Sequence, residues 1–337
     1  RSDEFIRHVT NKFVTTWRVF RGELGMKLHT IAKAAIALGL LAPLCLAQAP
    51  RAAHDHFNRG GSLYQKGDFE GATADFTKAI EISSRPYNRD LKGNAAFDSD
   101  ASKFDKVRVL DPLAAAAYSN RGLARYQLGD YEGAIADCDR ALVINPRLHD
   151  AYNNRGVARY ALKEYDRAVA DFDRAIAIDP RDAEAYNNRG NVYVDKEELD
   201  RALADFDRAI AIDPRLTAVY FNRGLARRAK KDGDGALKDF DKALALDPRF
   251  APGYFGRALV MCDRNKLDPA VNDFNRAIEL HPRYALAYGN RGLALLRQGK
   301  DAEAEKDFER AVALNPGLKA ELESNIERVR KWKQTNR

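Results

Sequence analysis

The sequence predicts an all-α protein in which pairs of helices stack into a solenoid. Three observations lead to this prediction. The hexapeptide AYNNRG occurs at 151–156 and again at 185–190, and near-copies recur every 34 residues on either side. Proline recurs at the same spacing. Apolar residues within each period are three or four positions apart, which is the spacing of a helix face. A fixed period of this length indicates one structural unit used many times.

Six full repeats follow one another at 115–148, 149–182, 183–216, 217–250, 251–284 and 285–318. We number the residues of each repeat from position 1 to position 34. Position 20 and position 27 are alanine throughout, position 8 is glycine in five repeats, and position 24 is phenylalanine in five. Position 4 is always tyrosine: Tyr118, Tyr152, Tyr186, Tyr220, Tyr254 and Tyr288.

Each repeat is expected to form two amphipathic helices. Positions 4, 8 and 11 share one helix face, and positions 20, 24 and 27 share another. Small residues let the two helix axes approach, while the aromatic residues fill the space beside them. Proline at position 32 disfavours helix in the residue before it and ends the second helix. Because one helix pair buries too little apolar surface to fold alone, neighbouring repeats must stack.

This pattern resembles the tetratricopeptide repeat family, which has an aromatic at 4, Leu-Gly at 7–8, Ala at 20 and 27, an aromatic at 24 and Pro at 32. The segment 151–180 fits, except that Arg155 replaces the leucine. The resemblance implies a right-handed superhelix of about eight units over residues 53–318. One unit, near 85–114, does not fit the pattern and is expected to be irregular. A capping helix with a basic tail is expected at 319–337.

Arginine at position 7 is matched by aspartate at position 23. We interpret the pair as structural, with the aliphatic part of arginine packed and its guanidinium bound to the carboxylate. The alternative is a row of cations for an anionic ligand. The structural interpretation predicts that Arg189→Leu folds at least as well as the parent and that Asp205→Leu is destabilised. The arginines are Arg121, Arg155, Arg189, Arg223, Arg257 and Arg291, and the aspartates are Asp137, Asp171, Asp205, Asp239, Asp273 and Asp307.

Asparagine recurs at position 6, on the face that lines the groove in tetratricopeptide proteins. The row resembles the asparagine ladder of O-linked N-acetylglucosamine transferase, which grips the backbone of extended peptides. An amide both donates and accepts hydrogen bonds, so it suits that task. The alternative, left equal, is a hydrogen bond between repeats that aligns the stack. The expected groove residues are Asn120, Asn154, Asn188, Asn222 and Asn290, with Tyr126, Tyr160, Phe221 and Phe255 as apolar pockets.

Residues 26–49 have the pattern of a secretory signal peptide, with lysines, a 13-residue apolar run and an Ala-Gln-Ala site. Cleavage after Ala47 and after Ala49 both remain open, as does an uncleaved membrane anchor. Residues 1–25 are interpreted as an upstream extension that is not native. We expect an exported protein, periplasmic if the source is Gram-negative, with Cys138 and Cys262 as free apolar side chains too far apart for a disulfide.

The formal charge is +7, of which residues 1–49 carry +4, so the repeats are nearly neutral. We see no basic stripe and expect no nucleic-acid partner. No phosphate loop, zinc-type cysteine pairing or nucleophile elbow occurs, and the only compact histidine cluster is His54-Asp55-His56. We therefore expect no enzyme activity, cofactor or metal. The sequence predicts a protein-binding scaffold for peptides or partner proteins in the cell envelope. The alternative is an accessory subunit of an envelope enzyme such as a glycan synthase or transferase.

Overall fold

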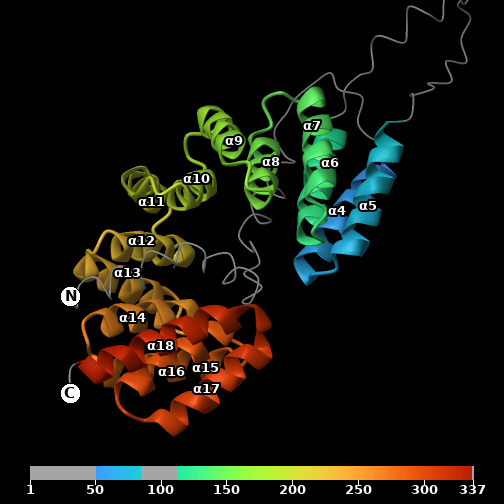
Figure 1. Cartoon of the computed structure of the whole chain (residues 1–337). Coiled ribbons are helices and arrows are strands. Elements are labelled where there is room, and N and C mark those ends of the chain that lie inside the picture. The colour runs from blue at the N-terminus through green and yellow to red at the C-terminus, as the bar shows by residue number, and fades with distance from the viewer. Residues whose placement is uncertain (1–50, 85–111, 336–337) are drawn as a thin grey trace, which may run out of the picture. The chain divides into compact units, whose positions relative to one another are not determined.

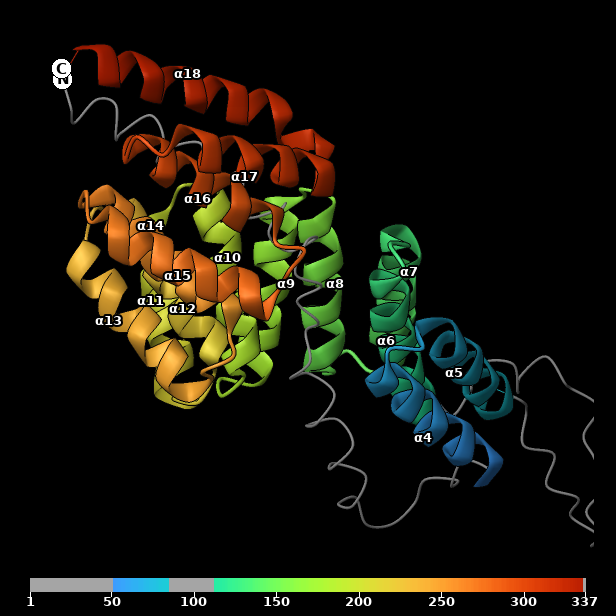
Figure 2. The ribbon, with the colours of Figure 1, turned by 90° about the horizontal axis from the view of Figure 1, so that it is seen from below.

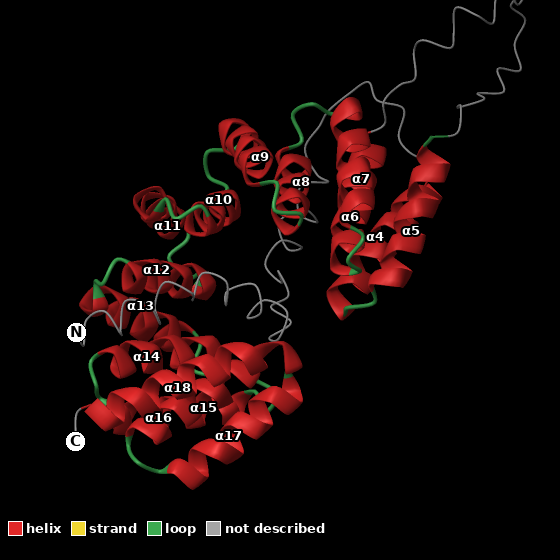
Figure 3. Ribbon diagram, in the orientation of Figure 1, coloured by secondary structure: helices red, strands yellow, loops and turns green. Residues whose placement is uncertain are grey.

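The computed structural model describes residues 51–84 and 112–335, and these residues form fifteen α-helices and one 3-10 helix (Figures 1 and 3). No strand occurs in these two ranges. The expected all-α repeat fold is confirmed. The predicted signal peptide and the upstream extension lie outside the described residues. The chain divides after Arg189 into two compact units, which are described in turn.

The first unit ends at Arg189, within α10 (Ala183–Asp195). Each repeat contributes a first helix and a second helix, as expected. The helices before α10 are α4 (Arg51–Lys66), α5 (Phe69–Ser83), α6 (Pro112–Gln127), α7 (Tyr131–Ile144), α8 (His149–Ala161) and α9 (Tyr165–Ile178).

The second unit starts at Gly190 and continues to the C-terminal end of the described chain. Its helix pairs end in α18, which packs on α16 and lies alongside it in Figure 2. Its complete helices are α11 (Leu199–Ile212), α12 (Thr217–Ala229), α13 (Gly233–Leu246), α14 (Ala251–Asp263), α15 (Leu267–Leu280), α16 (Ala285–Arg297), α17 (Asp301–Leu314), η2 (Pro316–Leu318) and α18 (Lys319–Thr335).

Local sequence explains where the helices end. Position 31 is extended, as at Asn145 with φ −131° and ψ 93°, because the following proline disfavours helix there. The turn between the two helices of a pair puts position 15 in the left-handed region. Glycine adopts this conformation without cost and occupies the site at Gly67, Gly129 and Gly299. Lys163, Glu197, Lys231 and Asn265 adopt it with a side chain.

The core of each repeat lies between its two helices. The phenylalanine at position 24 is almost fully buried, together with the alanines at 20 and 27. A Cβ atom on Gly156 would lie 2.8 Å from the Phe172 ring, so this glycine allows the close approach of the two helices. Cys138 takes the phenylalanine site in one repeat and is also fully buried.

The helix pair α4–α5, numbered in the same way from Ala53, packs directly on the pair α6–α7. Arg121 Nη1 donates to Thr77 Oγ1 at 3.0 Å, and Gln127 Nε2 donates to Tyr64 Oη at 3.1 Å. The expected irregular unit near 85–114 falls largely on residues outside the described ranges. The stack passes from α5 to α6 with no described helix pair between them.

The first helices of successive repeats form the inner layer of each unit. In the first unit α4 contacts α6 and α6 contacts α8, and in the second unit α12 contacts α14 and α14 contacts α16. Successive second helices make no comparable contact within either unit. Each stack therefore curves toward its first helices. We call the surface formed by positions 2, 5, 6, 9, 12 and 13 of these helices the inner face.

Candidate functional site

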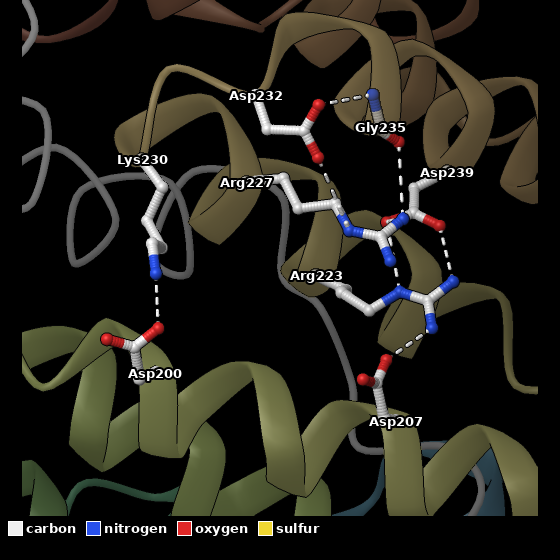
Figure 4. A network of polar contacts seen from close by, with 8 residues as sticks. All are labelled: Asp200, Asp207, Arg223, Arg227, Lys230, Asp232, Gly235 and Asp239. Carbon is white, nitrogen blue, oxygen red and sulfur yellow. Dashed lines mark hydrogen bonds and ion pairs between the residues drawn. The ribbon is translucent and has the colours of Figure 1, made fainter.

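Ion pairs between position 7 and position 23 connect the two helices of a repeat. Arg223 donates to Asp239 through Nε at 3.0 Å and Nη2 at 2.6 Å, and Arg227 Nη1 donates to the same carboxylate at 2.8 Å (Figure 4). The Asp239 side chain is 3% exposed. Equivalent pairs join Arg121 to Asp137, Arg155 to Asp171, Arg257 to Asp273 and Arg291 to Asp307.

The same arginines connect neighbouring repeats. Nη1 of Arg223 donates at 2.6 Å to Asp207, which is position 25 of the preceding repeat (Figure 4). Arg155 bonds Asp139 in the same way, Arg189 bonds Asp173, Arg257 bonds Asp241 and Arg291 bonds Asn275. Lys230 forms a further pair with Asp200 of the preceding repeat (Figure 4). Arg155, Arg223, Arg257 and Arg291 are thus each bound by side chains of two repeats, which agrees with the structural interpretation.

The tyrosine at position 4 covers the arginine at position 7 in all six full repeats. The guanidinium carbon lies 5.3–5.6 Å from the centre of the tyrosine ring. A cation over an aromatic face is attracted by the negative potential of the ring. Tyrosine and arginine therefore pair in the same way in all six full repeats, and in five of them the arginine also bonds the aspartate at position 23.

The asparagine row connects successive first helices. Asn154 Nδ2 donates to Ser119 Oγ at 3.0 Å, and Asn188 Nδ2 donates to Asn153 Oδ1 at 3.0 Å. In both cases position 6 bonds position 5 of the preceding repeat. The geometry at these two sites matches the alternative in which asparagine aligns the stack.

Several residues expected to line an open groove are buried instead. Asn154, Asn188 and Asn222 are 3–4% exposed, and Tyr160 is also buried. These side chains lie where one repeat packs on the next. Asn120, Asn290 and Tyr126 remain partly exposed. The prediction of an exposed ladder was therefore wrong for the buried members, because helical spacing identifies a face without showing how closely the next repeat covers it.

Phe221 and Phe255 do not form surface pockets. Phe221 is fully buried, with its ring 5.8 Å from Phe240 and 5.6 Å from Phe250. Phe255 packs 5.0 Å from Tyr284. The asparagine row breaks at Gly256, where a Cβ atom would lie 2.5 Å from the Phe240 ring. In these repeats the aromatic rings fill the contact between helices, beside the bond from Arg228 Nε of α12 to Asp263 of α14 at 2.6 Å. The expectation of apolar pockets was therefore wrong here.

Two acidic residues at position 2 were missed as site residues by the sequence analysis. Asp150 and Glu184 occupy this inner-face position in consecutive repeats of the first unit, whereas Ala218, Pro252 and Leu286 occupy it in the second. Burial and the neighbouring charges of Asp182 and Asp150 raise the pKa of Glu184 to about 8. The break in composition at one position was a signal that could have identified the pair.

The surroundings of this acidic pair contain one basic side chain. His149 Nδ1 lies 3.5 Å from Asp150 Oδ1 and 3.5 Å from Asp182 Oδ2, which is longer than a good hydrogen bond. The Asp182 carboxylate is the main cause that raises the pKa of His149 to about 9. Burial raises the pKa of Asp150, although His149 opposes this shift. The pair is thus only partly compensated.

The remaining candidates can be described briefly. Cys138 and Cys262 are both free, and Cys262 is partly exposed. His56 contacts Asp75 at 2.9 Å, within the first helix pair. Across 51–84 and 112–335, no three His, Cys, Asp or Glu side chains are placed to hold a metal ion. Within the same two ranges, every helix is too short or too polar to cross a membrane.

Comparisons with known proteins agree with this geometry. Family models described as tetratricopeptide repeat match residues 56–86, 115–148, 183–216, 217–250 and 255–319, and a TPR repeat model matches 158–196. Together they cover more than half of the chain. No curated protein matches the sequence significantly.

Solved structures share the fold. A tetratricopeptide repeat protein from Parabacteroides merdae ATCC 43184 is 19% identical with a TM-score of 0.59, over 82% of this chain and 98% of that one. The Pseudomonas aeruginosa protein pilF is 23% identical with a TM-score of 0.54, over 62% and 96%. The family matches, together with the repeated helix pairs, lead to one conclusion: the chain belongs to the tetratricopeptide repeat family.

Proposed function

We propose that this protein is a non-catalytic scaffold that binds peptide segments or partner proteins on its inner face. The observation that supports this most directly is the fixed geometry of that face. Hydrogen bonds between consecutive first helices, such as Asn188 to Asn153, hold the backbone in place before any ligand arrives. A preformed surface loses little conformational freedom on binding, which favours affinity.

The inner face offers different chemistry in the two units. In the first unit, its partly exposed side chains include Tyr126, Asp150 and Glu184. In the second unit, they include Leu225 and Leu293. Mixed polar and apolar groups are typical of surfaces that recognise protein segments.

We also propose that the protein acts in the cell envelope after export. The support is the pattern of 26–49, with its lysines, apolar run and Ala-Gln-Ala site. Cell fractionation of the natural host, followed by N-terminal sequencing of the mature protein, tests this part. A product in the cytoplasm with its leader intact would contradict it.

The binding proposal is tested by crosslinking in the natural host. A photoreactive residue replaces Ala116, at position 2 on the inner face, and a control carries it at Arg140, an exposed position of α7. We expect partner proteins to be captured from Ala116 and not from Arg140. Several partners would favour a general scaffold, whereas one stoichiometric enzyme would favour the accessory-subunit alternative. Capture only from Arg140 would place binding elsewhere and contradict the proposal.

A further inference from the structure

We infer that the inner face of the first unit binds a cationic side chain, lysine or arginine, carried by an extended segment of a partner protein. Asp150 and Glu184 would receive the cation. This inference rests on the proposed function, because it specifies the ligand of the same face. Four observations support it.

The first observation is the lack of a cationic partner for Glu184. Its carboxylate makes no hydrogen bond or ion pair with any described residue, although the side chain is only partly exposed. Asp182 and Asp179 nearby already accept backbone N–H groups, of Ala185 and Arg181 respectively. Glu184 therefore has acceptor capacity that no described residue uses.

The second observation is an unsatisfied amide oxygen on the same helix face as Asp150. Asn154 follows Asp150 by one helical turn, so the two side chains share a face. Asn154 is 4% exposed, and its Nδ2 group is taken by Ser119. Its Oδ1 atom has no hydrogen-bond partner. A buried acceptor without a donor is costly, and a donor from a ligand would satisfy it.

The third observation is the absence of lysine and arginine from this surface. In α4, α6, α8 and the part of α10 that belongs to this unit, positions 2, 5, 6, 9, 12 and 13 contain no lysine or arginine. His149, at position 1 of α8, lies 3.5 Å from Asp150 and compensates the pair only in part. Burial is the main cause that raises the pKa of Asp150 and of Glu184, and the charges of neighbouring acids add to it. A cation that binds here would stabilise the ionised carboxylates.

The fourth observation is the presence of tyrosine rings near the acids. Tyr64 and Tyr126 both occupy position 12 of the inner face, and Tyr126 is partly exposed. Burial is the main cause that raises the pKa of Tyr64 to about 12, and the negative charges of Tyr126 and Glu184 add to this shift. Aromatic faces together with carboxylates are typical of sites for ammonium and guanidinium groups. A metal ion is a poorer candidate, since no described group has the spacing of metal ligands.

The test measures binding of three fluorescein-labelled peptides that differ only in charge: repeats of Gly-Ser-Lys, Gly-Ser-Gln and Gly-Ser-Glu. Fluorescence anisotropy at low salt gives each Kd with the full chain. We expect the lysine peptide to bind about tenfold tighter than the glutamine peptide, the effect of one charge-assisted hydrogen bond. The double variant Asp150→Asn/Glu184→Gln should remove this preference.

A matched control has the same change in net charge. Glu70→Gln/Glu132→Gln alters two exposed carboxylates at position 18, away from the inner face. The control should keep the preference for lysine. If both double variants lose the preference for lysine equally, the peptide is attracted only by the net charge of the protein, and the inference is overturned. Circular dichroism checks that both variants fold.

The other outcomes separate the inference from the proposed function. If all three peptides bind alike and Asp150→Asn/Glu184→Gln weakens all three, the face binds peptides without preferring cations, so only the inference fails. If no peptide binds at millimolar concentration, the inference fails and the proposed function fails with it. Self-association of the parent that the double variant abolishes would identify the occupant as the basic C-terminal end of a second copy. That result would overturn the assignment to a partner protein.

Discussion

Replacing Arg257 with leucine should destabilise the protein far more than the same change at Arg223. The two arginines occupy the same position of consecutive repeats, and each forms two hydrogen bonds with the aspartate at position 23. They differ at position 11. Arg227 gives Asp239 a second cation, whereas Met261 occupies this site in the next repeat. Among the described residues, Arg257 is therefore the only cation that bonds Asp273.

The size of each stability loss depends on whether the aspartate keeps a cationic partner in the variant. The Asp273 side chain is 11% exposed, and Arg257→Leu leaves it buried without a cation. Removing one partner of a buried pair costs about 3–5 kcal/mol. Asp239 keeps Arg227 after Arg223→Leu, so the loss there is about 1–2 kcal/mol, roughly that of hydrogen bonds to a charged group. The double variant Arg257→Leu/Asp273→Leu should recover most of the stability, because it leaves no unpaired charge.

Urea unfolding followed by circular dichroism measures these free energies, and amide hydrogen exchange locates the change to α14 and α15. Equal losses for Arg223→Leu and Arg257→Leu would refute the reasoning. So would an Arg257→Leu variant as stable as the parent.

Three further predictions concern other parts of the chain. Glu184→Gln should stabilise the protein at pH 7 by about 1–3 kcal/mol, because a folded-state pKa of about 8 means that ionisation of Glu184 opposes folding. The gain should vanish below pH 4.5, the pKa of this group in the unfolded chain. Urea unfolding at a series of pH values measures the free energy of both proteins. Lys231→Gly should raise the midpoint of thermal unfolding, because Lys231 has φ 66° and this left-handed conformation costs about 1 kcal/mol for a residue with a side chain. Gly129→Lys, at the same position of another repeat, should lower the midpoint. Replacing 83–114 with Asn-Pro-Arg-Leu, the turn that follows α7, should keep the fold, because α5 packs on α6 as α7 packs on α8. Calorimetry would contradict this if the spliced chain lost its cooperative transition.

The repeat architecture could be predicted from the sequence because its cause is local. Helical spacing, proline at position 32 and small residues at 8, 20 and 27 each act within one repeat. The pairing of Arg155 with Asp171 was also accessible, since both residues recur together. What could not be predicted is how deeply neighbouring repeats bury each other. That depth depends on the fit of whole helices, as where Gly256 lets Phe240 approach.

The extent to which neighbouring repeats bury each other changes the expected effect of several substitutions. Leucine at position 7, usual in the family, suggested that Arg189→Leu would be harmless. The burial of aspartate at position 23, including Asp205 at 6% exposure, makes such a change costly wherever no second cation is present. The acid pair Asp150 and Glu184 was overlooked for the opposite reason. Acidic residues occupy position 2 in only two repeats, so this pair does not belong to the recurring pattern from which the other site residues were predicted.

The arginine at position 7 has a consequence for how such a protein can change its length. Because it bonds position 23 of its own repeat and position 25 of the previous one, every junction carries the same polar contacts. If one whole 34-residue period is duplicated or lost, as between Arg155 and Arg189, the new junction has equivalent contacts. No charged side chain is then left buried without a partner. The exception is the boundary where Phe240 packs against Gly256, since those two residues must be inherited together. Unequal recombination should therefore be tolerated among the hydrogen-bonded repeats and selected against across that aromatic boundary.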